Sequence, residues 1–110
     1  MPDGLQSVPI YKKIDTAAQL TTLVTGVPGR RMRIQALFLS ANAGPNSFAL
    51  RNVGTISTFI FGSVSVPDDN HFVLPYSSVG WGETAVGEGI ELLLTFTTSV
   101  GGVLVYVEVE

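Results

Sequence analysis

The sequence lacks cysteine and is poor in charge. Its 110 residues include no Cys, a single His, and 14% charged residues against 45% hydrophobic ones. The absence of Cys excludes disulfides, thiol catalysis and Cys-ligated zinc. A single His disfavours a cupin-like metalloenzyme, whose site needs several. Because a soluble domain averages about 25% charged residues, we expect part of this surface to be buried against other chains.

Long apolar runs and a basic leader are also missing. The chain starts Met1-Pro-Asp-Gly, without the basic and apolar regions of a secretory signal. No apolar run approaches the roughly 20 residues of a membrane helix, so we expect an intracellular product with no membrane partner. The net charge of -3 disfavours nucleic acid as a partner. The length suits one domain.

Positive and negative charges occupy different halves of the chain. No Lys or Arg follows Arg51, whereas seven of the nine carboxylates do. The cations are Lys12, Lys13, Arg30, Arg31, Arg33 and Arg51, and the later carboxylates are Asp68, Asp69, Glu83, Glu88, Glu91, Glu108 and Glu110. The two halves either face each other inside one domain, the interpretation we favour, or form a dipolar surface that pairs head to tail with other subunits.

Apolar and polar residues alternate with period two between short turn segments, which predicts strands. The predicted strands are 8–14, 20–24, 30–41, 48–53, 57–66, 72–76, 90–98 and 103–110. The Gly101-Gly102 pair predicts a tight hairpin, and 77–89 reads as a long loop. About eight strands indicate an all-β, single-domain jelly roll or antiparallel β-sandwich over residues 8–110.

The alternation also predicts which side chains face the core. In 30–41 one face carries Met32, Ile34, Ala36 and Phe38. Apolar residues on the opposite faces of their strands are candidates for a homotrimer seam, because the chain holds more apolar surface than one small core hides. These candidates are Leu37, Leu39, Leu93 and Tyr106.

Few residues suit catalysis or metal binding. His71 is the only His and lies beside a turn, so we interpret it as a solvated loop residue and expect no enzyme activity. The run from Asp68 to His71 offers ligands for a hard cation, but turns favour the same residues, and we predict no metal and no cofactor. Glu83, Glu88 and Glu91 match a glycosidase pair only in residue type.

Two further features suit binding better than catalysis. Arg30-Arg-x-Arg33 lacks the interleaved aromatics of a nucleic-acid platform, so we expect a solvated or salt-bridged strand face. Trp81, the only Trp, stands between two glycines. It is either an anchor for a partner or a plug over the end of the sandwich.

The C-terminal half carries a recognisable series of motifs. They are Phe72-Val-Leu-Pro-Tyr76, Gly80-Trp-Gly-Glu-Thr-Ala-Val-Gly-Glu88, Ile90-Glu-Leu-Leu-Leu-Thr95 and Val100-Gly-Gly-Val-Leu-Val-Tyr-Val-Glu-Val109. This series resembles small tailed-phage capsid decoration (cement) proteins of jelly-roll type, over roughly residues 15 to 110 at the level of pattern. The chain departs from them at Gly82, where a second aromatic is expected after the Trp.

The resemblance implies a virion structural protein without an active site. Such a protein is made in the host bacterial cytoplasm, forms a homotrimer and binds the capsid exterior, where it holds major capsid protein subunits together. The alternative is a tail or fibre head domain that binds a host glycan, because jelly rolls also serve as lectins and Tyr76 and Trp81 suit sugar stacking.

The first seven residues form a predicted flexible arm. Residues 1–7 precede the first patterned strand and hold too little apolar surface to fold alone. An arm that becomes ordered only on a capsid loses its conformational entropy on binding. We therefore name Pro2, Asp3 and Leu5, together with Trp81, as candidate capsid contacts; a plain ragged terminus is the alternative.

Overall fold

The protein is described by a computed structural model that covers residues 8–41, 44–53, 59–67 and 69–109. These residues form nine strands, and they contain no helix long and apolar enough to cross a membrane. The strands are β1 (Ile10–Thr16), β2 (Leu20–Val24), β3 (Arg31–Ala41), β4 (Asn46–Val53), β5 (Phe59–Val66), β6 (Asn70–Leu74), β7 (Gly82–Glu83), β8 (Gly89–Leu94) and β9 (Val100–Val109).

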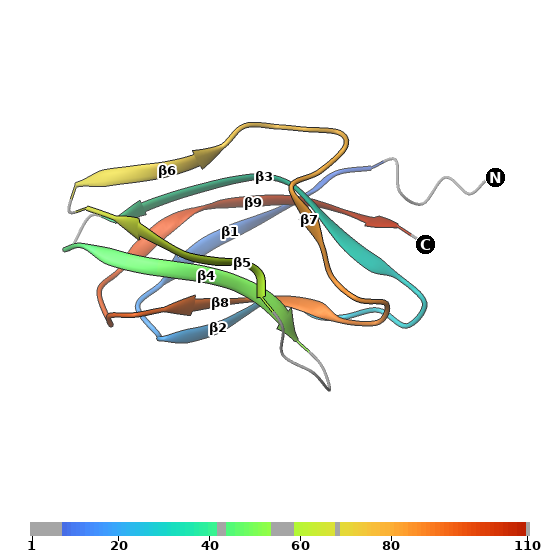
Figure 1. The fold of residues 1–110 in the computed structure, drawn as a ribbon, viewed down its shortest axis with the longest axis horizontal. Coiled ribbons are helices and arrows are strands. Elements are labelled where there is room, and N and C mark those ends of the chain that lie inside the picture. Colours follow the sequence, from blue (N-terminus) through green and yellow to red (C-terminus); the bar gives the residue numbers. More distant parts are fainter. Residues whose placement is uncertain (1–7, 42–43, 54–58, 68, 110) are drawn as a thin grey trace.

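The strands build two antiparallel sheets that pack face to face (Figure 1). Sheet A has the order β1-β9-β3-β6, with the short β7 also beside β3, and sheet B has the order β2-β8-β4-β5. With β7 set aside, each sheet alternates strands from the two halves of the chain. This order results when one long hairpin is folded in half and rolled up, which is a jelly roll. The predicted all-β jelly-roll sandwich is therefore confirmed.

The predicted hairpin at Gly101-Gly102 is wrong. Both glycines lie inside β9, and the turn after β8 comes earlier, at residues 95–99. Gly102 is required by close packing instead, because a Cβ atom there would collide with the carbonyl oxygen of Phe38 on the neighbouring strand β3. Since β8 ends at Leu94, Phe96 does not continue the apolar face of that strand and is exposed.

A β-bulge in β3 reverses the predicted faces of its second half. Ile34 pairs with Tyr106 and Ala36 with Val105, so Gln35 is an extra residue with no partner position on β9. Because a one-residue insertion moves every later side chain to the opposite face, Leu37 and Leu39 point into the core and Phe38 points out. The sequence prediction was wrong for these three residues and for Ala36, which lies on the outer face with Phe38.

The core lies between the two sheets. Its members are largely the alternate apolar residues of the inward faces, with Phe48 of β4 meeting Phe72 of β6 edge to face across the sandwich, at 5.2 Å between ring centroids. Burial of one Leu or Ile side chain stabilises the fold by about 1.5–3 kcal/mol. The core residues are Ile14, Leu23, Val24, Met32, Ile34, Leu37, Leu39, Ala41, Phe48, Leu50, Val66, Ile90, Leu92, Leu94, Val100 and Leu104.

Candidate interaction surface

A loop rich in apolar side chains connects β6 to β7, and β3 holds it in place. β6 pairs with residues 37–41 of β3 and β7 pairs with residues 33–34, so the connecting segment 75–81, the Trp81 loop, runs past the bulge. There the backbone N–H of Ser77 donates to the Gln35 carbonyl at 2.9 Å, and that of Trp81 donates to the Ile34 carbonyl at 2.8 Å. The bulge thus supplies the acceptors that fix the loop.

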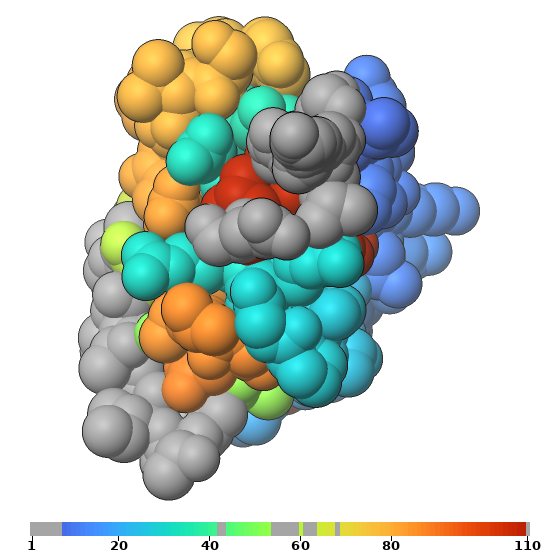
Figure 2. All heavy atoms as spheres, turned by 90° about the vertical axis from the view of Figure 1, so that its right-hand side faces the viewer, coloured from blue at the N-terminus to red at the C-terminus, as the bar shows by residue number. Residues whose placement is uncertain are grey.

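The Trp81 loop presents its apolar side chains to solvent. Val79 is 81% exposed, Tyr76 60% and Trp81 45%. The indole N–H of Trp81 donates to the Pro75 carbonyl at 2.8 Å, which closes the loop on itself and leaves the ring half-uncovered. The indole N–H of Trp81 thus holds the loop while its ring is half exposed, and its role as an anchor for a partner stays a prediction. Figure 2, which views the molecule from the right-hand side of Figure 1, shows the loop in gold protruding at the top.

Departure from the decoration-protein pattern at Gly82 has a steric cause. A Cβ atom on Gly82 would lie 2.6 Å from Cγ2 of Ile60 on β5. Strand β7 at the edge of sheet A thus approaches β5 at the edge of sheet B so closely that any side chain at Gly82 would require Ile60 to move. The aromatic residues of the Trp81 loop are Tyr76 and Trp81.

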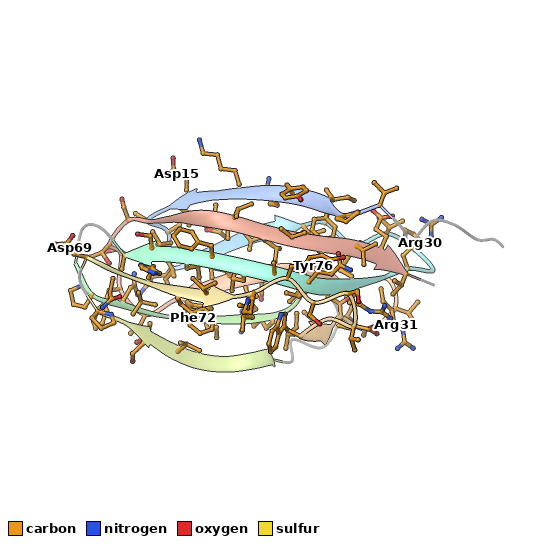
Figure 3. All side chains as sticks on the ribbon, turned by 90° about the horizontal axis from the view of Figure 1, so that it is seen from above. Asp15, Arg30, Arg31, Asp69, Phe72 and Tyr76 are labelled. Carbon is orange, nitrogen blue, oxygen red and sulfur yellow. The ribbon has the colours of Figure 1, made fainter. Side chains whose placement is uncertain are left out.

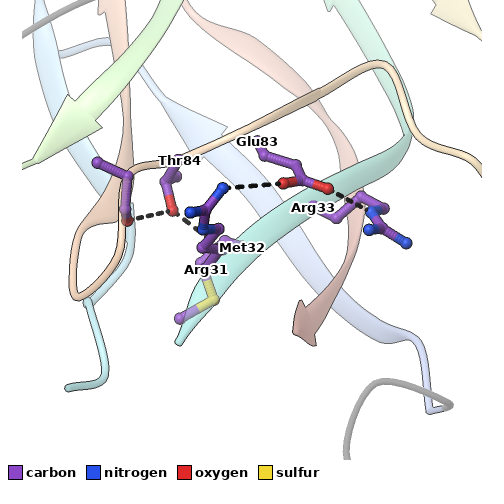
Figure 4. A network of polar contacts seen from close by, with 6 residues as sticks. Arg31, Met32, Arg33, Glu83 and Thr84 are labelled. Carbon is purple, nitrogen blue, oxygen red and sulfur yellow. Dashed lines mark hydrogen bonds and ion pairs between the residues drawn. The ribbon is translucent and has the colours of Figure 1, made fainter. Parts of the chain in front are cut away.

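The predicted basic cluster lies at the end of the sandwich that holds residues 25–30 and 85–88, where glutamates pair with its arginines (Figure 2). Arg33 Nε lies 2.6 Å from a Glu83 carboxylate oxygen, whose second oxygen lies 3.9 Å from Arg31 (Figure 4). Arg30 pairs with Glu108 at 3.2 Å. The expected salt-bridged face is confirmed, and one carboxylate shared by Arg31 and Arg33 leaves a net positive charge there.

Beside this pair, Thr84 closes the same edge. Its hydroxyl accepts the backbone N–H of Met32 at 2.9 Å and donates to the Ala85 carbonyl at 3.0 Å (Figure 4). A buried backbone donor of β3 is thereby satisfied by a side chain where the two-residue β7 ends.

The ion pairs explain the charge segregation of the sequence. In the described part of the chain, each of the four Arg–Glu pairs joins an arginine of the first half to a glutamate of the second half. Arg51 of β4 pairs with Glu91 of β8 on the outer face of sheet B, where the Glu91 side chain is only 8% exposed. The interpretation that the two halves face each other inside one domain is confirmed.

Residues considered for catalysis are placed apart or already paired. His71 is exposed as predicted, but it lies on strand β6 and not in a loop, with its ring 5.5 Å from that of Phe38. Asp69 occupies a turn with a positive φ of 56°. Glu83 and Glu91 are bound to arginines on opposite sheets. Among the described residues, His, Asp and Glu form no group of three able to hold a metal ion.

The four seam candidates occupy different environments. Leu37 and Leu39 are each 1% exposed inside the core, so they are unavailable to a neighbouring subunit. Tyr106 packs against the core from β9, and burial, with a smaller effect of Glu108, raises the pKa of its hydroxyl. Leu93 alone lies half-buried on an outer face, that of sheet B.

Candidate contacts in the N-terminal arm fall outside the described residues. Pro2, Asp3 and Leu5 belong to residues 1–7, so their role stays a prediction.

The sequence analysis missed an exposed apolar face. Tyr11, Phe38 and Val73 are exposed on the outer face of sheet A. The sequence signal for this face was concealed by the bulge, which alone makes Phe38 point outward.

Comparisons with known proteins give structural likenesses only. No protein-family model matches the chain, and no curated protein does. It is similar to the virus-like particle of the extra small virus of the giant freshwater prawn Macrobrachium rosenbergii, with 15% identity, a TM-score of 0.32, and coverage of 90% of this chain and 77% of that one. It is also similar to the VP2 subviral particle of infectious bursal disease virus, with 14% identity, a TM-score of 0.29, and coverage of 90% and 33%.

Proposed function

We propose that this chain is a structural protein of a tailed-phage virion that binds the outside of the capsid and strengthens contacts between major capsid protein subunits. The proposal rests on the resemblance of its C-terminal motifs to decoration proteins and on the rigid, apolar Trp81 loop. It involves no catalysed reaction, cofactor or metal.

The observation that carries the proposal is the tethering of this loop. Two hydrogen bonds to β3 and one from the Trp81 indole hold segment 75–81, while Val79 and Trp81 stay exposed. A loop that is ordered before binding loses little conformational entropy on contact. Several such chains on one particle would each join neighbouring subunits, so weak single contacts add up to a stable shell.

A pair of valine substitutions tests the capsid contact. Val79→Asp places a charge at the exposed tip of the Trp81 loop, and we expect it to weaken binding to undecorated capsids by at least about tenfold. Val86→Asp is the matched control, because Val86 is also an exposed loop valine, 52% exposed, outside the Trp81 loop. Co-sedimentation of each purified variant with capsids measures the difference. Equal binding by the two variants would reject the loop as the contact.

Glycan binding by a tail or fibre protein is the second candidate, favoured by the exposure of both Tyr76 and Trp81 on one loop. Such a site stacks sugars on aromatic rings and adds hydrogen bonds from nearby polar groups, whereas the Trp81 indole N–H is already used by Pro75. Strong signals on a glycan array, with no binding to capsids, would establish this alternative. A tail gene next to the coding sequence would favour it, and a capsid gene would favour decoration.

A further inference from the structure

The outer face of sheet A carries an apolar band that crosses all four long strands. In one row Tyr11 lies beside Val105 and Ala36, and in the next row Val103 lies beside Phe38 and Val73. The exposed fractions are 73% for Tyr11, 50% for Val73 and 38% for Phe38, whereas Val105 is only 7% exposed, so the first three supply most of the exposed apolar surface. We call these six residues the apolar band: Tyr11, Ala36, Phe38, Val73, Val103 and Val105.

A positively charged row lies on one side of the band, and an acidic row lies on the other. On one side Arg33 pairs with Glu83, with Arg31 beyond it, and the shared carboxylate leaves one net positive charge. On the other side the row holds Asp15 and His71, and Asp69 follows in the adjoining turn. Figure 3 shows Asp15 and Asp69 toward one end of the long axis and Arg31 toward the other, with Tyr76 between them.

We propose that two copies of this chain pack through their apolar bands, related by a two-fold axis that lies in the interface and runs across the strands. This rotation reverses the strand direction, so the positive end of each copy faces the acidic end of the other. An axis along the strands would instead set each end against the same end of the second copy. Charge complementarity therefore selects both the occupant, a second copy, and its orientation.

The side chains of the band fit this arrangement. With the axis between the two rows, the large ring of Phe38 faces the small Ala36 of the second copy. Lys13, which shares the row of Phe38, faces Tyr11 of the second copy, where an ammonium group attracts an aromatic ring. In the outermost rows His71 faces Glu83 of the second copy. Each contact occurs twice, as two-fold symmetry requires.

The size of the face suits a reversible pair. Four strands about 4.8 Å apart and four rows about 6.8 Å apart cover roughly 500 Å² per chain in flat projection. The pair then buries on the order of 1,000 Å², the lower limit of a specific interface. We expect dissociation in the micromolar range. Because both copies use the same face, assembly through it stops at two chains, in place of the trimer expected from the sequence.

The oligomeric state tests this proposal independently of capsid binding. Light scattering with size-exclusion chromatography at tens of micromolar should give twice the 11.7 kDa chain mass. Phe38→Lys places a charge in the centre of the band and should raise the dissociation constant at least tenfold, as should Val73→Lys at its edge. Phe96→Lys is the matched control, because Phe96 is 53% exposed but lies in the turn after β8, and it should leave the pair intact.

Three results would overturn the proposal. They are a monomer or trimer mass for the unmodified chain, an unchanged pair in both Phe38→Lys and Val73→Lys, or equal loss in Phe96→Lys. Circular dichroism of each variant checks that it remains folded, and Val73→Lys, at a more exposed position, replaces Phe38→Lys if the latter unfolds. Failure here leaves the capsid assay untouched, because that assay measures the Trp81 loop.

Discussion

Replacing Asn46 with Ala is expected to destabilise the protein by more than the loss of one hydrogen bond, because this one side chain makes several. Asn46 begins β4 and is 3% exposed. Its Nδ2 group donates toward the carbonyls of Phe96 (2.9 Å) and Thr98 (3.2 Å) and the Thr98 hydroxyl (2.9 Å), and its Oδ1 accepts the N–H groups of Phe96 (3.0 Å) and Ser47 (2.9 Å). One buried side chain therefore holds the turn between β8 and β9.

The expected loss follows from these contacts. Asn46→Ala removes the partners of several backbone groups at once, and each lost hydrogen bond costs about 1 kcal/mol net. Because the Phe96 and Thr97 side chains are exposed, water reaches part of the turn, so we estimate a total of about 3 kcal/mol. For a chain of this size 1 kcal/mol corresponds to about 4 °C. The melting temperature should fall by roughly 12 °C.

Thermal unfolding followed by circular dichroism measures this loss. Asn46→Asp keeps both accepted hydrogen bonds but sets a buried carboxylate oxygen against the carbonyl oxygens of Phe96 and Thr98, so it should lower the melting temperature at least as much as Asn46→Ala. Asn70→Ala is the control, because Asn70 is exposed and its side chain accepts only the adjacent His71 N–H in the contacts described. A shift for Asn46→Ala no larger than that for Asn70→Ala would refute the assigned role.

Four shorter predictions follow from other contacts. Arg51→Ala leaves the Glu91 carboxylate buried without its cation and should cost about 3 kcal/mol in chemical denaturation. Gly82→Phe should lower the melting temperature, because even a Cβ at this position is too close to β5. The raised pKa of Tyr106 means that the folded state holds its proton more tightly than the unfolded state, so stability should fall as pH rises above 10, and less so in Tyr106→Phe. His71→Ala should leave the melting temperature and capsid binding unchanged, and weakened capsid binding would contradict our interpretation of this exposed residue.

Fold class and most strands were predictable because they depend on local patterns, whereas the two-residue β7, which lies inside the predicted loop 77–89, was missed. Period-two alternation and turn residues located most strands of the sandwich to within a few residues, and the Leu20–Val24 strand matched at both ends. The charge segregation foretold that the two halves pack together, as the Arg30–Glu108 and Arg51–Glu91 pairs show. These features need no knowledge of distant neighbours.

Errors arose where a distant strand decides the local structure. Gly101-Gly102 matches a hairpin pattern, but only the closeness of β3 reveals that Gly102 serves packing. Gln35 has no local sign of a bulge, since its extra position is defined by the register with β9. The exposure of Phe96 likewise depends on Asn46, which binds the turn from 50 residues away.

The bulge at Gln35 links the fold to both proposed surfaces. By shifting the register it sends Leu37 and Leu39 into the core, which removes them from any subunit seam, and turns Phe38 outward into the apolar band. The same distortion lies where β3 changes partners from β6 to β7, and there the carbonyls of Ile34 and Gln35 fix the Trp81 loop. The bulge thus lies beneath both proposed surfaces. Deleting Gln35 should give regular pairing with β9 and keep Leu37 in the core and Phe38 outward, because the pairs on both sides of the bulge stay the same. It should therefore loosen the Trp81 loop, which loses the carbonyl that accepts the Ser77 N–H, and weaken capsid binding while the pairing of two copies through the apolar band persists. Loss of the pair in this deletion variant would contradict the assigned register.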